Sequence, residues 1–424
     1  MILYKGELYK TENQDMLLNE LFDSLTTTLS ESRLDTETVI NAFDRLSVEL
    51  SNGNLNSIIE HVDYEDKETA IAMATRMMSR EYLEYKVKVE FNNRSLYEEL
   101  PEFKVKTQRY PLGVIFHIAA GNMDVLPIVS VAEGLLAGNI NILKLPRVDQ
   151  GLTIEVLKFL VDFEPKLKDY IYVFDTPSTD VAAMKKLADL SDGISVWGGD
   201  EAIGAVRSLA KPGTRLIEWG HKLGFCYVSG DGSESELRAL AEHIMMTRQL
   251  LCSSCQVIYL DTDNSERLQE FAKKFVDYLD SAFDKYPIMD VGAIAELSLR
   301  RYVDSLNAVV GSGATDENII RGKHSSVTVG KDSELELSYM YGNVIVKALP
   351  RKDIVPVLRR HKEHLQTAGL ICAAEERTML ANEFYKAGIE RVTSSGEMSE
   401  YYDGEAHDGE FALQRYTRFI NFME

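Results

Sequence analysis

The sequence predicts an α/β protein built around a doubly wound parallel sheet. Between residues 110 and 220, apolar β-branched stretches of strand length alternate with stretches of helical periodicity. Such alternation is typical of parallel strands that are covered by helices on both faces. A second alternation of the same kind begins near Leu223, and 424 residues leave room for roughly two to three domains. We therefore expect a parallel-sheet domain followed by a second α/β domain.

The most informative stretch is residues 110–147, which predicts a strand, a tight turn, a helix and a second strand. Residues 113–118 form a nearly continuous apolar run, and small residues with Asn122 then break it. Lys144 and Arg147 stand at the end of the second strand, over residues 140–145. Because doubly wound sheets bind ligands outside the carboxyl ends of their strands, we expect Asn122, Lys144 and Arg147 at one crevice.

The remaining elements follow in chain order. Helices are predicted for residues 16–29, 36–50, 154–163, 181–190, 200–209, 234–248 and 265–283, and strands for residues 171–174, 194–197, 214–218, 224–229 and 411–422. Residues 85–91 and 103–108 alternate between apolar and polar residues and predict a hairpin. We expect a cofactor domain over residues 1–222 with an inserted hairpin at 86–109, a catalytic domain over 223–395, and a tail over 396–424 that returns to the first lobe or to an oligomer interface.

The composition excludes several function classes. A formal net charge of −21 disfavours nonspecific binding to nucleic acid or anionic membranes. No run approaches the roughly 18 apolar residues of a membrane span. Residues 1–20 do not resemble a secretory signal, so we expect a cytoplasmic protein. The four cysteines show no repeated paired spacing, which predicts reduced thiols.

Cys252 is the candidate nucleophile. It stands at the head of the apolar run CSSCQVIYL, where two serines and Gln256 make the corner polar. A thiol in such a corner can face a crevice, and a lowered pKa would make it reactive. The alternative is a buried, inert cysteine, which is the more usual state of free cysteine and the one we expect for Cys226 and Cys372.

Cys252 and Cys255 also form a lone C-x-x-C. This spacing suits a dithiol redox pair or half of a zinc site. The sequence has no second cysteine pair and no histidine at ligand spacing, so we expect no metal.

Two further segments carry candidate site residues. Trp197, Gly198 and Gly199 lie between a predicted strand and a helix N-terminus, where bare backbone can approach a phosphate. Ordinary strand-to-helix turns use glycine as well. Glu218 closes a strand and suits a general base if a dry crevice raises its pKa, or else a cap or ion-pair carboxylate. His407-Asp408-Gly409 predicts a turn.

In this order, the motifs resemble the aldehyde dehydrogenase superfamily, and most closely its fatty acyl-CoA reductase (LuxC-type) branch. The resemblance spans roughly residues 86–424 and rests on six matches, at residues 111–114, Asn122, residues 136–144, residues 197–204, residues 218–222 and Cys252. The C-S-S-x-Q run from Cys252 to Gln256 points to the reductase branch. Residues 339–343 depart from the family, because a Tyr replaces the Glu that binds ribose there.

The resemblance implies roles for single residues. Cys252 would accept an acyl group, and Asn122 with the Cys252 backbone N–H would stabilise its oxyanion. Lys144 would reach the adenosine ribose, Trp197, Gly198 and Gly199 would border the dinucleotide, and Ile203 would flank the adenine. Arg147 stands where NAD-preferring relatives often carry an acid, and a guanidinium suits a 2′-phosphate, so we expect NADPH, with NADH as the alternative.

The resulting hypothesis is an NADPH-dependent enzyme that reduces acyl-CoA, a coenzyme A thioester, to an aldehyde through a thioester on Cys252. Reduction of an acyl phosphate, as in glutamyl-phosphate reductases, and aldehyde oxidation with Glu218 activating water are the enzymatic alternatives. A non-catalytic thiol redox sensor that uses Cys252 and Cys255 is the alternative of another class. The resemblance also implies a homo-oligomer built by sheet extension and an acyl-transferring or acyl-activating protein partner.

Overall fold

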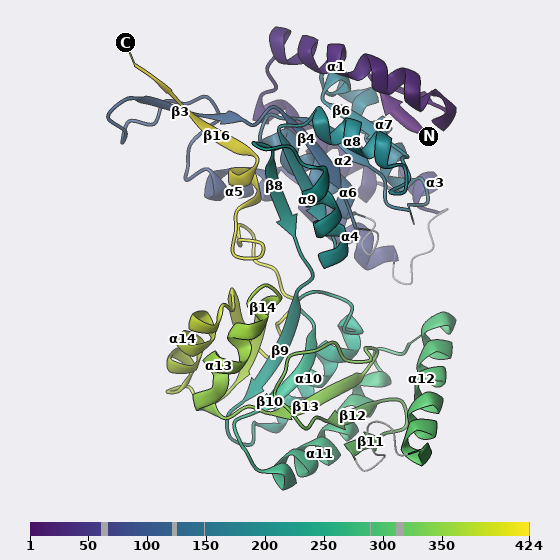
Figure 1. Ribbon diagram of the computed structural model, residues 1–424, viewed down its shortest axis with the longest axis vertical. Coiled ribbons are helices and arrows are strands. Elements are labelled where there is room, and N and C mark those ends of the chain that lie inside the picture. The colour runs from purple at the N-terminus through teal and green to yellow at the C-terminus, as the bar shows by residue number, and fades with distance from the viewer. Residues whose placement is uncertain (61–66, 121–124, 148, 289, 311–317, 424) are drawn as a thin grey trace. The chain divides into compact units, whose positions relative to one another are not determined.

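The computed structural model describes residues 1–60, 67–120, 125–147, 149–288, 290–310 and 318–423. The chain folds into two compact units, each with its own sheet (Figure 1). Unit 1 comprises Met1–Gly220 and Tyr402–Glu424, and unit 2 comprises His221–Tyr401. Within the described ranges, no helix combines the length and the apolar character that a membrane crossing needs.

The sheet of unit 1 confirms the doubly wound fold. Its strand order in the described residues is β2-β1-β6-β5-β4-β7-β8. The strands are β1 (Ile2–Tyr4), β2 (Glu7–Tyr9), β4 (Val114–Ile118), β5 (Ile140–Lys144), β6 (Ile171–Phe174), β7 (Gly193–Trp197) and β8 (Arg215–Trp219). All pairs from β6 to β8 are parallel, and β1 joins β6 antiparallel. The strand order reverses between β4 and β7, which is the topological switch point where such sheets bind ligands.

Helices connect these strands and complete unit 1 (Figure 1). They are α1 (Gln14–Glu31), α2 (Thr36–Ser51), α3 (Asn56–Ile59), α4 (Lys67–Met78), α5 (Arg80–Glu90), α6 (Leu126–Leu136), α7 (Leu152–Phe163), α8 (Val181–Asp189), α9 (Asp200–Leu209) and α15 (Ala412–Arg415). Strands β4, β5 and β6 are buried almost throughout because helices cover both faces, which explains their continuous apolar sequences.

The expected hairpin over residues 86–109 is wrong in its first arm. Residues Arg80–Glu90 form helix α5, and the Ser79 side chain caps its N-terminus. The buried Lys86 ammonium lies 2.6 Å from the Glu90 carboxylate and 3.0 Å from that of Glu133. The four-residue spacing of Lys86 and Glu90 matches one helical turn. The alternation over residues 85–91 is too short to distinguish a strand from a helix.

The second arm is a strand with a different partner. Strand β3 (Lys106–Pro111) pairs antiparallel with the tail strand β16 (Thr417–Phe422) in a two-stranded sheet (Figure 1). The predicted tail strand over residues 411–422 is therefore too long, because α15 occupies its first part. The Glu90 carboxylate accepts the backbone N–H of Leu413 at 2.7 Å and so holds the start of α15. Strands β1 and β2 were not predicted, because three residues each are too few to show a period.

Unit 2 contains the second predicted sheet, with the strand order β11-β12-β13-β10-β9-β14-β15 in the described residues. Its strands are β9 (Leu223–Val228), β10 (Cys255–Leu260), β11 (Ile319–Arg321), β12 (Ser326–Val329), β13 (Asn343–Ala348), β14 (Leu365–Ile371) and β15 (Arg391–Ser394). Its helices are α10 (Glu234–Thr247), α11 (Ser265–Phe283), α12 (Val291–Val310), α13 (Ile354–Leu358) and α14 (Arg377–Ala387). Alternate residues of β9 enter two separate hydrophobic cores, so this sheet is also covered on both faces.

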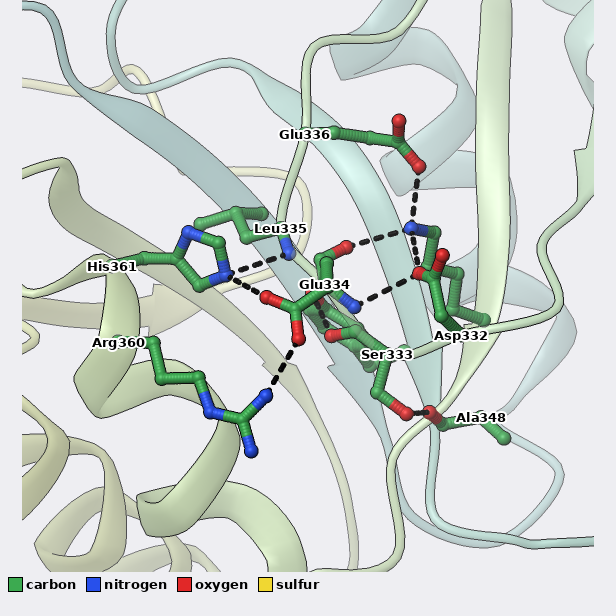
Figure 2. Close-up of polar contacts among 10 residues, drawn as sticks. Asp332, Ser333, Glu334, Leu335, Glu336, Ala348, Arg360 and His361 are labelled. Carbon is green, nitrogen blue, oxygen red and sulfur yellow. Dashed lines mark hydrogen bonds and ion pairs between the residues drawn. The ribbon is translucent and has the colours of Figure 1, made fainter.

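Polar contacts anchor the loop between β12 and β13 in unit 2. Figure 2 shows the Glu334 carboxylate between His361, whose Nε2 lies 2.7 Å away, and the Arg360 guanidinium at 2.9 Å. The buried Lys347 ammonium, on β13, forms ion pairs with Asp332, at 2.6 Å, and with Glu336. These contacts fix the loop that leads to Ser338, whose hydroxyl contacts Gln249 and Gln256.

Candidate active site

Cys252 lies in a turn between α10 and β10, and we call residues 248–254 the nucleophile turn. Arg248 and Gln249 both adopt left-handed backbone conformations, with φ of 52° and 62°, and reverse the chain at the end of α10. Cys252 is partly exposed, whereas Cys226 and Cys255 are fully buried. Cys372, which we expected to be buried, is partly exposed as well. Strand β10 begins at Cys255, so Cys252 lies in the turn just before the strand, and its role as the nucleophile stays a prediction.

Two buried glutamines hold the nucleophile turn at both ends. The Gln249 amide donates to the carbonyl of Cys255 at 2.9 Å, and the Gln256 amide donates to the carbonyl of Gln249 at 2.7 Å. The Ser338 hydroxyl bridges them, because it accepts from Gln249 at 2.9 Å and donates to Gln256 at 2.8 Å. Gln256 of the C-S-S-x-Q motif thus fixes the shape of the turn that carries Cys252.

The segment that replaces the family's ribose-binding Glu contacts the same turn. The backbone N–H of Gly342 donates to Oε1 of Gln249 at 3.1 Å. Met340 and Tyr341 before it have φ of 59° and 49° and form a tight reversal. In unit 2, residues 339–343 therefore support the nucleophile turn.

Close backbone contact fixes the turn from its other side. Gly224 of β9 pairs with Cys255, and the register of β10 shifts between Cys255 and Val257. A Cβ on Gly224 would lie only 2.6 Å from the carbonyl oxygen of Ser254 and 2.7 Å from that of Ser253. Only glycine lets the turn approach β9 this closely. Sequence analysis did not single out Gly224, because nothing in its local sequence marks this contact.

Two polar groups of unit 2 reach the thiol of Cys252. The amide Nε2 of Gln366 donates to Sγ at 3.3 Å. The hydroxyl of Tyr401 is a neighbour of the Cys252 and Ser253 side chains. Burial of that hydroxyl is the largest cause that raises the pKa of Tyr401, and the neighbouring thiol raises it further, so Tyr401 is a protonated donor at neutral pH.

Cys255 does not share this polar setting. Its side chain is 0% exposed, and its thiol donates to the carbonyl of Val257 at 3.4 Å. Burial raises the pKa of Cys255 far above its usual value. A buried thiol of this kind is a poor nucleophile, which disfavours dithiol chemistry with Cys252.

Lys144 and Arg147 lie at the carboxyl end of β5 in unit 1. Lys144 is only 6% exposed, whereas Arg147 is exposed. Burial is the largest cause that lowers the pKa of Lys144, and Arg147 lowers it further, while Asp175 opposes them. A desolvated donor in this position fits the hydroxyl groups of a nucleotide ribose.

The turn after β7 offers bare backbone at the N-terminus of α9. Gly198 donates its backbone N–H to the carbonyl of Trp219 at 3.1 Å, and Gly199 is the N-cap of α9. Nothing lies within 4 Å of a Cβ built on Gly199. Ile203 is 9% exposed and packs against the sheet one turn further along α9. This arrangement fits a dinucleotide phosphate, although Asp200 places a negative charge in the first helical turn.

Trp197 is held by a chain of buried polar groups. Its indole N–H donates to the Ser130 hydroxyl at 3.3 Å, which lies 2.8 Å from Nδ1 of His117. Nε2 of His117 lies 2.8 Å from the amide oxygen of Asn141. Burial lowers the pKa of His117 to about 4, so this ring is neutral at pH 7. These hydrogen bonds fix the orientation of the Trp197 indole beside the turn after β7.

The tail of unit 1 adds an aromatic cluster that sequence analysis missed. The ring of Trp197 stacks on that of Trp219 at 5.1 Å, and the His407 ring lies 5.3 Å and 5.2 Å from them. The predicted turn is present, because Glu410 donates its backbone N–H to the carbonyl of His407 at 2.9 Å. Only the fold reveals that this turn places His407 on two tryptophans.

Glu218 forms an ion pair, and Asn122 lies outside the described residues. The Arg207 guanidinium donates to both oxygens of Glu218, at 2.6 Å and 2.7 Å. This bidentate pair favours the ion-pair alternative, and a catalytic role for Glu218 stays a prediction. The oxyanion role of Asn122 likewise stays a prediction.

Comparisons with known proteins show the family and the fold of the chain. The family model described as "Acyl-CoA reductase (LuxC)" matches residues 32–419. The chain is 24% identical over 333 residues to the long-chain acyl-protein thioester reductase of Vibrio harveyi, covering 76% of this chain and 67% of that protein. It is 23% identical over 360 residues to the enzyme of the same name from Photorhabdus luminescens, with coverage of 79% and 69%.

Solved structures show the same fold. A putative aldehyde dehydrogenase from Burkholderia cenocepacia superposes with a TM-score of 0.69 at 12% identity, covering 100% of this chain and 96% of that chain. The NADP-dependent glyceraldehyde-3-phosphate dehydrogenase from Bacillus halodurans C-125, complexed with NADP, gives a TM-score of 0.67 at 15% identity, with coverage of 99% and 98%.

Proposed function

Because the chain belongs to the acyl-CoA reductase (LuxC) family and has the aldehyde dehydrogenase fold, we propose that it reduces an acyl thioester to an aldehyde through a covalent thioester on Cys252. The observation that carries the proposal is the setting of this thiol. Cys252 is partly exposed, sits in a turn fixed by buried glutamines, and has the Gln366 amide as a hydrogen-bond donor at its sulfur. These are the features of a nucleophilic cysteine rather than a structural one.

The first half-reaction is acyl transfer. The thiolate of Cys252 attacks the thioester carbonyl, and negative charge develops on the carbonyl oxygen. The backbone N–H of Cys252 and the amide of Asn122 are proposed to hold that oxygen. The intermediate then collapses, the acyl group stays on Cys252, and the thiol group of the substrate leaves. Acyl-CoA and an acyl group on a carrier protein present the same reacting bond, and the relatives are named acyl-protein thioester reductases.

The second half-reaction is reduction of the enzyme thioester. A bound nicotinamide dinucleotide supplies the hydride for this step. In the proposal, Lys144 binds its ribose, the backbone at Gly198 and Gly199 accommodates its phosphates, and Trp197 and Ile203 line its path. Arg147 is proposed to pair with a 2′-phosphate, which makes NADPH the cofactor. The glyceraldehyde-3-phosphate dehydrogenase from Bacillus halodurans C-125, which carries NADP on the same fold, is consistent with this choice.

The contact between Glu218 and Arg207 favours reduction over aldehyde oxidation. Oxidation would require a carboxylate free to activate water, whereas both oxygens of Glu218 already accept from a guanidinium. Assembly into a homo-oligomer through β3 and β16, and action beside an acyl-transferring or acyl-activating protein, stay predictions of the family resemblance.

The proposal is tested by aldehyde formation from acyl-CoA and NADPH by the full chain. Cys252→Ser is expected to abolish the aldehyde, whereas Cys255→Ser, which changes a buried thiol three residues away, should retain it. Equal activity in both variants would contradict the role of Cys252. Faster turnover of an acyl phosphate than of any acyl thioester would instead support the alternative substrate class.

A further inference from the structure

The amide of Gln366 reaches the sulfur of Cys252, and the reaction described above gives it no role. Gln366 is the second residue of β14, and only 6% of it is exposed. Its Nε2 lies 3.3 Å from Sγ of Cys252. Both residues belong to unit 2, so this contact is made within one compact body.

Neighbouring groups determine which end of the amide faces the sulfur. The Thr367 hydroxyl, itself fully buried, donates to Oε1 of Gln366 at 3.4 Å. Oε1 is therefore the end engaged by a hydroxyl, and Nε2 is the end that points to Sγ. The sulfur thus faces an N–H donor.

The local backbone holds this donor in place. The Gln366 carbonyl accepts the backbone N–H of Glu390 at 3.2 Å, and the register between β14 and β9 shifts between Leu365 and Ala368. Such irregularities re-aim side chains beside functional sites. Because the side chain is buried and fixed, its N–H needs little reorganisation when charge develops on the sulfur.

An N–H donor at this position favours the charged form of the nucleophile. The thiolate, not the thiol, attacks a carbonyl, and a hydrogen bond donated to a thiolate lowers the pKa of that thiol. The Tyr401 hydroxyl is a neighbour of the Cys252 side chain and can donate to the same atom. Gln366 and Tyr401 together can stabilise negative charge on Sγ.

Resting on the function proposed above, we propose that Gln366 is a catalytic residue that donates a hydrogen bond to Sγ of Cys252 in both half-reactions. In the first, the thiolate forms the bond to the acyl carbon, and the bond from that carbon to the substrate sulfur breaks, so that the substrate leaves as a thiolate. In the second, after hydride addition to the acyl carbon, the bond to Sγ breaks and its electron pair returns to the sulfur. The aldehyde is released, and Gln366 again donates to a thiolate.

The test is the pH dependence of Cys252 alkylation by iodoacetamide, followed by mass spectrometry of the peptide that carries Cys252. Gln366→Met keeps the size of the side chain and removes the donor. Its alkylation midpoint should rise by about one to two pH units, which lowers the rate at pH 7 by roughly 10- to 100-fold. Gln366→Glu should raise the midpoint further, because a carboxylate repels the thiolate.

Controls separate this role from a structural one. In Gln366→Met, the rate of Cys252 alkylation at high pH should equal that of the wild-type protein. Cys372, which is also partly exposed, should keep its own alkylation midpoint. Tyr401→Phe removes only a hydroxyl from a side chain that is 46% exposed, so the fold should tolerate it, and its midpoint should rise as well. Unchanged Cys252 midpoints in Gln366→Met and Tyr401→Phe would overturn the proposal.

The pH dependence of Cys252 alkylation can be measured whether or not the proposed function is correct. Alkylation requires neither an acyl substrate nor a cofactor, so it reports on Gln366 even if Cys252 never carries an acyl group. Loss of aldehyde formation at pH 7 with recovery near pH 9 in Gln366→Met would add the link to turnover. Failure of acylation at Cys252 in the wild-type protein would contradict the proposed function alone.

Discussion

Replacing Gly224 with alanine tests whether contact with β9 fixes the nucleophile turn. The new Cβ would lie 2.6 Å from the carbonyl oxygen of Ser254, whereas ordinary contacts begin at 3.4 Å. The turn must therefore retreat by about 0.8 Å, the difference between these distances. A displacement of about 1 Å near reacting groups costs on the order of 100-fold in rate. Overpacking of a buried site costs about 1–3 kcal/mol of unfolding free energy.

The assays are urea unfolding and the rate of aldehyde formation. Gly204→Ala is the matched control for stability, because nothing lies within 4 Å of its Cβ and Gly204 lies within helix α9. We expect this control to gain about 0.5–1 kcal/mol, since alanine favours a helix more than glycine does. If Gly224→Ala keeps the wild-type rate and unfolds like Gly204→Ala, the turn is not fixed by this contact.

Three further predictions follow from the contacts of single residues. Gln256→Leu removes the amide that donates to the Gln249 carbonyl and accepts from the Ser338 hydroxyl. These two buried groups each lose a partner, so urea unfolding should show a loss of about 1–3 kcal/mol, and an unchanged value would mean that this network does not stabilise the turn. Burial lowers the pKa of His117 from 6.5 to about 4, so between these pH values the unfolded chain binds a proton that the folded chain does not bind. The contribution of neutral His117 to the free energy of unfolding is complete above pH 6.5. It is lost as pH falls towards 4, at about 1.4 kcal/mol per pH unit. His117→Gln should show a shallower loss between pH 7 and 5 in urea unfolding, and an identical slope would contradict the assignment. Arg147→Ala should reduce the preference for NADPH over NADH, measured as the ratio of kcat/KM values, by roughly 10-fold or more, whereas an unchanged ratio would exclude contact with the 2′-phosphate.

The fold was predictable where apolar patterns were long or strands were buried on both faces. Residues 171–174, 200–209 and 265–283 match β6, α9 and α11 at both ends. Buried parallel strands have continuous apolar sequences, and the intervening helices carry a clear 3.6-residue period. The prediction failed over residues 85–91, where a short alternation hid the helix that the Lys86–Glu90 ion pair and the Ser79 cap support.

The candidate site was predictable only where its residues share a local motif. Cys252 and Gln256 belong to one short polar segment of the sequence. In the structure Cys252 lies in the nucleophile turn, and Gln256 hydrogen-bonds to the start of that turn. Gly224, Gln366 and Tyr401 are far from Cys252 along the chain, and the fold alone brings them to the nucleophile turn. No local spacing marks such residues, because their side chains act through contacts between separate strands and loops.

Mass spectrometry of the protein after exposure to acyl-CoA thioesters, without a nicotinamide cofactor, tests the central claim most directly. In the absence of hydride the reaction should stop after acyl transfer, so the wild-type chain should gain the mass of one acyl group on the peptide that carries Cys252. Cys252→Ser should gain no such thioester. An acyl group found on another residue, or the absence of any adduct across a panel of chain lengths, would contradict the claim that Cys252 carries the acyl group.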